Sequence, residues 1–321
     1  MNPVQTYESI QDRLQQVEER IRAQSDGHHP ELGAALDHLL SSGGKRVRPT
    51  VTLLMGEILE ADPNRLINLA AAIEMLHTAT LVHDDLIDGA LLRRGIPTLN
   101  AQWTPAATVL AGDFIFARAA KLASDTDSVE VMQMFAETLA VIVNGEITQM
   151  FSKHEDSRRK EYFERIYAKT ASLFEVATTA AAVLSNVNQE IQDAAHTYGY
   201  EIGMAFQIVD DVLDFTSEQS TVGKPVASDL RQGLITLPAI YYIDAHPDDP
   251  DVQLLIKGNH YNEDGLSRLA EAISKSSAIG ETMKEANQYL DRALKALGRL
   301  PESPEREALE DLANYIVRRD Y

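Results

Sequence analysis

The chain has 321 residues, of which 44% are hydrophobic, so it is long enough for one large domain or two ordinary ones and can fold around a sizeable core. Its net charge of −20 argues against nucleic acid or an anionic membrane surface as its partner. The absence of cysteine excludes disulfides, thiolate chemistry and cysteine-ligated zinc.

The beginning of the chain carries no recognisable targeting pattern. Residues 1–10 are polar and lack the basic and then apolar layout of a signal peptide. No stretch approaches the run of about 18 uncharged apolar residues that a transmembrane helix needs. We therefore expect a cytoplasmic protein without an integral membrane segment.

Apolar residues recur at helical spacing through most of the chain, and no convincing run alternates with a period of two. This pattern predicts helices at about residues 4–24, 30–42, 49–60, 63–89, 99–122, 128–151, 160–184, 188–217, 229–244, 264–276, 279–298 and 303–319. The polar stretch 152–160 is interpreted as a surface loop between neighbouring antiparallel helices. The sequence thus predicts an all-α protein: a single domain over residues 1–321, built as a helical bundle around a deep central pocket.

The segment Gly43-Gly44-Lys45-Arg46-Val47-Arg48-Pro49 places three cations beside flexible backbone at a predicted helix start. Backbone N–H groups, helix polarity and basic side chains together form an anion site. An ordinary basic loop is the alternative interpretation. The segment is not a Walker loop, because the spacing of that motif is absent.

Three carboxylates lie in the otherwise apolar run Val82-His83-Asp84-Asp85-Leu86-Ile87-Asp88. On a helix, Asp84 and Asp88 are i,i+4 neighbours, and Asp85 and Asp88 are i,i+3 neighbours. All three can therefore crowd one side of the helix. Solvated aspartates on an amphipathic helix are the plain alternative, but the apolar flanks favour a cation that neutralises the cluster.

The same spacing returns in Ile208-Val209-Asp210-Asp211-Val212-Leu213-Asp214. Oxygen-only ligands suit Mg²⁺, which usually binds proteins through one or two carboxylates together with substrate phosphates. The duplicated motif therefore predicts one metal–diphosphate site with two walls. The two motifs are called here the first and second aspartate motifs.

Several basic and polar residues could complete such a site. Arg93-Arg94 follows the first motif and could form plain salt bridges or help to enclose a diphosphate. Lys169-Thr170 and Gln207 are weak indicators singly, because these residues are usually solvated on helices. Lys224, in a loop flanked by glycine and proline, is a better candidate for contact with a bound anion.

In combination, these motifs resemble the trans-type polyprenyl diphosphate synthases, from about Gly43 to Pro238. The resemblance implies that Lys45, Arg48, His77 and Arg94 hold isopentenyl diphosphate without metal. It implies that the allylic diphosphate is held by Arg93, Lys169 and Lys224 and, through two or three Mg²⁺ ions, by Asp84, Asp85, Asp88, Asp210, Asp211 and Asp214. Thr170 and Gln207 would line the reaction centre.

The implied reaction is head-to-tail condensation, in which diphosphate leaves the allylic substrate and the resulting carbocation is attacked by isopentenyl diphosphate. The metal-binding aspartates with Arg93, Lys169 and Lys224 would stabilise the leaving group. The departing diphosphate would take the proton, so no side-chain base is assigned. Apolar walls would exclude water. The resemblance also implies a homodimer.

Product length in this family depends on how far the growing tail descends beside the helix of the first motif. Short-chain members carry an aromatic residue four or five positions before the first aspartate, where this chain has the small residues Thr80 and Ala79. The tail would then reach Leu76 or beyond. Leu234 also stands where short-chain members carry a lysine. We therefore expect a long-chain product; a farnesyl or geranylgeranyl diphosphate synthase is the alternative.

Other classes account for fewer of these residues. His83-Asp84, with His77 as a further ligand, also matches helical HD-type phosphohydrolases, but that interpretation gives the second aspartate motif no role. A terpene cyclase or head-to-head synthase would not need Lys45, Arg48 and Arg94. A regulatory subunit of a two-component synthase would be expected to have lost aspartates.

Overall fold

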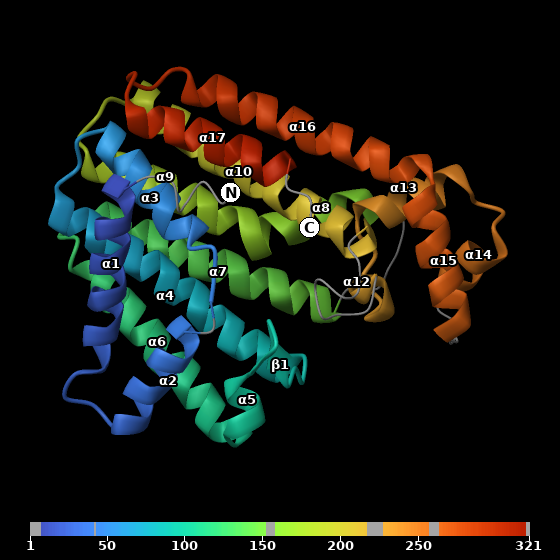
Figure 1. Cartoon of the computed structure of the whole chain (residues 1–321), viewed down its shortest axis with the longest axis horizontal. Coiled ribbons are helices and arrows are strands. Elements are labelled where there is room, and N and C mark those ends of the chain that lie inside the picture. The colour runs from blue at the N-terminus through green and yellow to red at the C-terminus, as the bar shows by residue number, and fades with distance from the viewer. Residues whose placement is uncertain (1–7, 42, 152–157, 217–226, 257–262, 319–321) are drawn as a thin grey trace. The chain divides into compact units, whose positions relative to one another are not determined.

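The computed structural model describes residues 8–41, 43–151, 158–216, 227–256 and 263–318 (Figure 1). Its α-helices are α1 (Glu8–Arg22), α2 (Pro30–Ser41), α3 (Val47–Ile58), α4 (Pro63–Ile87), α5 (Leu99–Gln102), α6 (Pro105–Ser124), α7 (Val129–Phe151), α8 (Arg158–Ile166), α9 (Ser172–Leu184), α10 (Gln189–Thr216), α12 (Ser228–Arg231), α13 (Leu237–Ala245), α14 (Pro250–Ile256), α15 (Glu263–Lys275), α16 (Ser277–Leu297) and α17 (Pro304–Arg318). A 3₁₀ turn, η2 (Ala23–Ser25), follows α1, and a π-helical stretch, η3 (Tyr167–Ala171), joins α8 to α9. The predicted all-α class is confirmed.

The contacts within the chain divide it into two compact units, which are described separately. Unit 1 comprises Met1–Ala140, Leu173–Gly199 and Leu294–Ala313, and unit 2 comprises Val141–Ser172, Tyr200–Ala293 and Asn314–Tyr321. The first aspartate motif belongs to unit 1 and the second to unit 2. The single domain and its central pocket stay predictions.

Helix α4 is the core of unit 1 and packs against α1, α3 and α6. It begins where the sequence predicts, because Pro63 occupies its first turn and the Asp62 carboxylate accepts hydrogen bonds from the backbone N–H groups of Asn64 and Arg65. Its middle, residues 66–76, is buried throughout. Such a helix is long and apolar enough to cross a membrane, but 72% of its most apolar window is buried inside the protein.

Two predicted helices are interrupted. The prediction of one helix over 99–122 is wrong, because Thr104 caps α6 through the backbone N–H of Ala107 and Pro105 starts a new helix. The predicted helix over 229–244 is wrong in the same way. There α12 ends before Gly233, whose φ of +81° is left-handed, and α13 starts again with Pro238 in its first turn.

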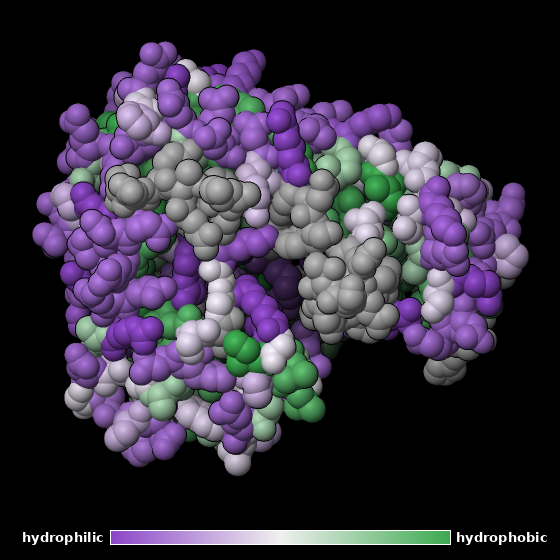
Figure 2. Space-filling view, in the orientation of Figure 1, coloured by the Kyte–Doolittle hydropathy of each residue, from purple (hydrophilic) through white to green (hydrophobic). Residues whose placement is uncertain are grey.

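A short hairpin follows α4, although no strand was expected. Strands β1 (Leu92–Arg93) and β2 (Ile96–Pro97) pair antiparallel, with Arg93 opposite Ile96. The two residues between them, Arg94 and Gly95, have φ of +53° and +77°, which is the pattern of a type I′ turn. Leu91 and Leu92 are each 61% exposed, and Figure 2 shows apolar surface where Figure 1 places this hairpin.

Unit 2 has an apolar cluster of its own, built by the end of α10 and the helices α12 to α15. Phe215, Tyr242 and Ile273 are among its buried members. This cluster supports the end of α10, where the second aspartate motif lies.

Candidate functional site

Both aspartate motifs lie at the carboxyl-terminal end of a long helix. Asp84 and Asp85 occupy the last turn of α4 and Asp88 is its C-cap, while Asp210 and Asp214 lie in the last two turns of α10. The partial negative charge of the helix terminus disfavours a carboxylate there by about 0.3–1 kcal/mol. Each motif therefore concentrates negative charge where the backbone already repels it, and a bound cation would relieve both effects.

In the first motif, Asp85 is only 6% exposed and is paired with Arg93. Arg93 donates from Nε to both carboxylate oxygens at 2.9 and 3.1 Å and from Nη2 to one of them at 2.7 Å. The chain turns back directly after α4, where Gly89 has a φ of +64° and the backbone N–H of Ala90 donates to the Asp85 carbonyl at 2.8 Å, and this turn precedes the strand that carries Arg93. Asp84 is half-buried and Asp88 is exposed.

The Gly43-Gly44 segment packs against the turn of the hairpin. The Arg94 guanidinium donates a hydrogen bond to the backbone carbonyl of Gly43. A Cβ added to Gly44 would lie 3.2 Å from a guanidinium nitrogen of Arg94 and 3.3 Å from one of Arg46. Glycine thus leaves room for the close approach of two arginines to the backbone.

Arg48 and His77 form the second basic contact of this region. The Nη1 of Arg48 lies 3.2 Å from the Nε2 of His77, and the guanidinium lies 5.0 Å from the centre of the Phe174 ring. Burial and the nearby arginines, Arg48 first among them, lower the pKa of His77 well below its usual value. Because arginine can only donate, His77 is neutral and accepts at Nε2.

The Arg46 side chain has a different role from its neighbours. It donates to Glu18 at 3.1 Å, to Glu74 at 3.0 Å and to the backbone carbonyl of Leu40 at 2.8 Å. These partners fix the start of α3. Lys45, the residue before Arg46, is half-buried.

The three residues predicted to set product length lie on α4 below the first motif. Leu76 and Ala79 are 0% exposed, and the half-buried Thr80 donates its hydroxyl to the backbone carbonyl of His77. They line the apolar interior of unit 1. Their effect on product length stays a prediction.

The second motif is held by different partners. Asp211 is 2% exposed and accepts hydrogen bonds from the Tyr162 hydroxyl at 2.7 Å and from the Gln207 amide at 2.8 Å. Burial and, after it, nearby Asp229 raise the pKa of Asp211 to about 8, although the two hydrogen bonds oppose the rise. Asp210 is half-buried.

Asp214 is used by the structure as a cap. Its carboxylate accepts from the backbone N–H of Ser228 at 3.1 Å, from the Ser228 hydroxyl at 2.8 Å and from the backbone N–H of Asp229 at 3.2 Å. It therefore connects the end of α10 to the first turn of α12.

Lys169 and Thr170 lie in the π-helical stretch η3, a type of irregularity that is frequent at functional sites. Thr170 donates to the Gln207 carbonyl oxygen at 2.7 Å, and Lys169 pairs with Glu146 at 2.8 Å. Gly145 allows this approach of α7, since an added Cβ would lie 2.4 Å from the Cβ of Ala168. Lys224 lies outside the described residues.

Sequence reasoning missed Tyr162, Glu146 and the Gly43 carbonyl as parts of these sites. Tyr162 belongs to an ordinary amphipathic helix and is 49 residues from Asp211. Glu146 stands out only by following Gly145 in an apolar helix. No local pattern marks any of the three.

His83 packs against α6 instead of standing with the aspartates. Its Nε2 lies 3.2 Å from the Val109 carbonyl and 3.7 Å from the Asp113 carboxylate. A Cβ on Gly112 would lie 2.1 Å from the same nitrogen, so glycine is needed there. In the part of the chain that the structure describes, no three acidic or histidine side chains form a cluster that could hold a metal ion by themselves. The position of His83 against α6 does not favour the phosphohydrolase interpretation.

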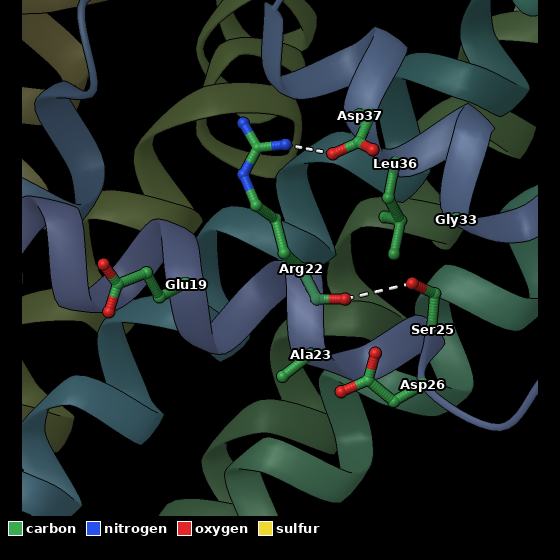
Figure 3. A pocket seen from close by; sticks show the side chains of 8 residues that line it. All are labelled: Glu19, Arg22, Ala23, Ser25, Asp26, Gly33, Leu36 and Asp37. Carbon is green, nitrogen blue, oxygen red and sulfur yellow. Dashed lines mark hydrogen bonds and ion pairs between the residues drawn. The ribbon is translucent and has the colours of Figure 1, made fainter.

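The structure also has a pocket of about 530 Å³ between the α1–η2 segment and α2 (Figure 3). It is lined by Glu19, Arg22, Ala23, Ser25, Asp26, Gly33, Leu36 and Asp37. Arg22 is paired with Asp37, and the remaining charged residues are acidic. Such a lining disfavours an anionic substrate, and the pocket shares no residue with either motif.

Comparisons with known proteins agree with the motifs. Residues 29–273 match the family model described as polyprenyl synthetase. The chain is 36% identical over 318 residues to heptaprenyl diphosphate synthase component 2 of Geobacillus stearothermophilus, covering 98% of each protein.

Solved structures give the same result for the fold. A decaprenyl diphosphate synthase from Rhodobacter capsulatus superposes with a TM-score of 0.90 at 33% identity, covering 98% of this chain and 97% of that one. A polyprenyl synthase from Caulobacter crescentus, in complex with calcium and isoprenyl diphosphate, has a TM-score of 0.90 at 36% identity and covers 99% and 97%. The chain therefore belongs to the polyprenyl synthetase family and is a trans-prenyltransferase.

Proposed function

We propose that this protein condenses isopentenyl diphosphate head-to-tail with an allylic diphosphate and releases a long-chain trans polyprenyl diphosphate. The observation that carries the proposal is the repeated placement of an aspartate motif at the negative end of a long helix, once on α4 and once on α10. Each motif is accompanied in its own unit by basic residues: Arg93 and Arg94 in unit 1, and Lys169 in unit 2.

We further propose that the reaction requires two or three Mg²⁺ ions. The donor set fits this metal, because it consists of carboxylates, and Mg²⁺ binds through one or two of them together with substrate phosphates. Such binding does not require the protein to supply three ligands in one cluster, and no such cluster occurs among the described residues. The related Caulobacter enzyme was crystallised with calcium and isoprenyl diphosphate, which supports a divalent ion.

The six carboxylates do not have equal roles in this proposal. Protein donors already hold Asp85, Asp211 and Asp214. We assign metal contact to both motifs, and we infer that the donors to these three carboxylates orient them, with Asp214, which also caps α12, in the most supporting role. When bound, Mg²⁺ would stabilise the negative charge that develops on the departing diphosphate.

The basic residues of unit 1 account for binding of isopentenyl diphosphate. Lys45, Arg48 and Arg94 present positive charge close to a glycine-rich backbone in a chain of net charge −20. Neutral His77 keeps the Arg48 guanidinium in place without adding a titrating charge at neutral pH. Planar guanidinium groups match phosphate oxygens in two-pronged geometry.

On the allylic substrate, Arg93 and Lys169 would hold the diphosphate and stabilise it as it leaves. Asp85 orients Arg93 through three hydrogen-bond contacts, so the guanidinium need not reorganise during the reaction. Apolar residues of α4 would exclude water from the carbocation. The departing diphosphate would accept the proton, and no side-chain base is required.

The direct test is incubation of the purified chain with labelled isopentenyl diphosphate, Mg²⁺ and allylic primers of several lengths, followed by sizing of the products. We expect long-chain products that disappear when the metal is chelated. Products that stop at farnesyl or geranylgeranyl length would contradict the long-chain assignment. Phosphate release without elongation, abolished by His83→Gln, would favour a hydrolase instead.

Product length can be tested at the residues of α4 that are predicted to limit how far the growing tail descends. Ala79→Tyr places a large side chain at a fully buried position of α4, and we expect shorter products. Because overpacking a core costs about 1–3 kcal/mol, Thr80→Phe at the neighbouring half-buried position serves as a second variant. Unchanged product length in both folded variants would refute the prediction that these positions limit the length of the tail.

We also propose that the protein acts as a homodimer. Val109 and Leu110 of α6 are 40% and 66% exposed, which leaves apolar surface on this helix in the single chain. Analytical ultracentrifugation of the purified protein gives the oligomeric state directly, and a monomer at working concentration would contradict the proposal.

A further inference from the structure

A chain of hydrogen bonds crosses unit 2 from η3 to α8. The Thr170 hydroxyl donates to the carbonyl oxygen of Gln207, and the Gln207 amide donates to one oxygen of Asp211. The Tyr162 hydroxyl donates to the other oxygen of Asp211. Three of these four residues, Tyr162, Asp211 and Thr170, are at most 5% exposed.

The hydrogen bonds run in one direction through this chain. Asp211 accepts at one oxygen from Tyr162 and at the other from Gln207. The Gln207 amide then presents its nitrogen to Asp211 and its oxygen to Thr170, and it cannot turn over without losing both bonds. The orientation of Thr170 in η3 thus depends on a carboxylate that the Tyr162 hydroxyl holds from the opposite side.

The Tyr162 ring is held independently of its hydroxyl. Its centre lies 5.2 Å from that of Phe163, and the Arg165 guanidinium lies 5.6 Å away. Arg165 is itself fixed by a 2.8 Å hydrogen bond to the backbone carbonyl of Ile235. Removing the hydroxyl therefore leaves the ring packed and removes one link of the chain.

We propose that Tyr162 is a positioning residue of the prenyltransferase reaction, acting through Asp211 and Gln207 on Thr170 and on the adjoining Asp210 and Lys169. The inference rests on the proposed function, which assigns Asp210 to the metal and Lys169 to the allylic diphosphate, and on the sequence-based expectation that Thr170 lines the reaction centre. Tyr162 itself touches no substrate in this account.

The test is Tyr162→Phe, assayed with saturating substrates. We expect kcat to fall about tenfold, the effect of one lost hydrogen bond to a charged group, and the KM for isopentenyl diphosphate to change less than about twofold. The KM is spared because the residues assigned to isopentenyl diphosphate lie in unit 1. An unchanged kcat would overturn the inference.

Tyr198→Phe is the matched control. Tyr198 is also 0% exposed, and its hydroxyl donates to the Leu309 carbonyl at 2.9 Å within unit 1. Both variants lose a buried hydrogen bond, but only Tyr162→Phe should lower kcat. Equal losses of kcat in the two variants would show a merely structural role and overturn the inference.

A double-mutant cycle with Asp211→Asn tests the route of the effect. If Tyr162 acts through Asp211, Tyr162→Phe lowers kcat less in the Asp211→Asn background than in the wild type. Additive losses would overturn the inference. Failure of the proposed function is distinguishable from these outcomes, because it would appear as absent elongation by the wild-type protein in the same assay.

Discussion

The two aspartate motifs have the same spacing and the same position at a helix end, but their second aspartates are stabilised in different ways. Asp85 is neutralised by the charge of Arg93, whereas Asp211 is held by the neutral donors Tyr162 and Gln207. The third aspartates differ too, since Asp88 is exposed and Asp214 caps another helix. A shared sequence pattern thus fixes where the carboxylates lie, while the groups that hold them differ from one motif to the other.

The largest effect is expected where a carboxylate serves the metal. Asp210→Ala should lower kcat by about three orders of magnitude, the equivalent of about 4 kcal/mol of lost charge stabilisation. Steady-state kinetics at several Mg²⁺ concentrations measures this loss. Asp214→Ala, two residues from the end of α10, should lower kcat much less. Equal losses would erase the distinction between ligand and supporting carboxylates.

Charge pairing in the first motif is tested by Arg93→Lys, which keeps the charge and removes the fork that contacts both oxygens of Asp85. We expect kcat/KM for the allylic diphosphate to fall about tenfold. Arg65→Lys is the control, because Arg65 also lies in unit 1 and donates to the backbone carbonyl of Thr126. Full activity of Arg93→Lys would mean that charge alone suffices.

The capping role of Asp214 predicts a loss of stability. Asp214→Ala should lower the free energy of unfolding by about 0.5–2 kcal/mol, as replacement of other helix caps does. Chemical denaturation followed by circular dichroism measures the change. Asp62→Ala removes the comparable cap of α4, and its loss of unfolding free energy is the reference for Asp214→Ala. An unchanged denaturation midpoint for Asp214→Ala, beside a lowered one for Asp62→Ala, would show that the contacts to α12 contribute nothing.

The smallest effect is expected in the pH dependence of stability, through the neutral His77. Because the pKa of folded His77 is well below its unfolded value near 6.5, the unfolded state binds the extra proton as pH falls below about 6.5. Stability is therefore lost toward acid, by at most about 1.4 kcal/mol per pH unit from this residue. His77→Gln should show a shallower decline between pH 7 and pH 5, measured by denaturant midpoints. Parallel curves would contradict a buried neutral histidine.

The sequence predicts best what is decided by neighbouring residues. The start of α4 follows from Asp62-Pro63, and the location of each aspartate motif on a helix follows from apolar periodicity. These features depend on capping chemistry and on side-chain spacing within a few turns. The family follows as well, because its motifs are local.

The partners of the carboxylates could not be predicted, because they come from distant parts of the chain. Asp85 meets Arg93 after a turn at Gly89 that ends α4, and the strand that carries Arg93 has two residues, too few for periodicity to reveal. Tyr162 reaches Asp211 across packed helices. The close approach of Gly145 to Ala168 of η3 likewise joins residues from different helices.

The turn of the hairpin sets two demands on one residue. Arg94 adopts a left-handed backbone conformation that costs a residue other than glycine about 1–2 kcal/mol, and asparagine or glycine would adopt it more easily. Those residues would provide no guanidinium. Selection for thermal tolerance alone would therefore favour replacement of Arg94, and under the proposed function a heat-adapted variant obtained in that way would hold its homoallylic substrate, isopentenyl diphosphate, poorly.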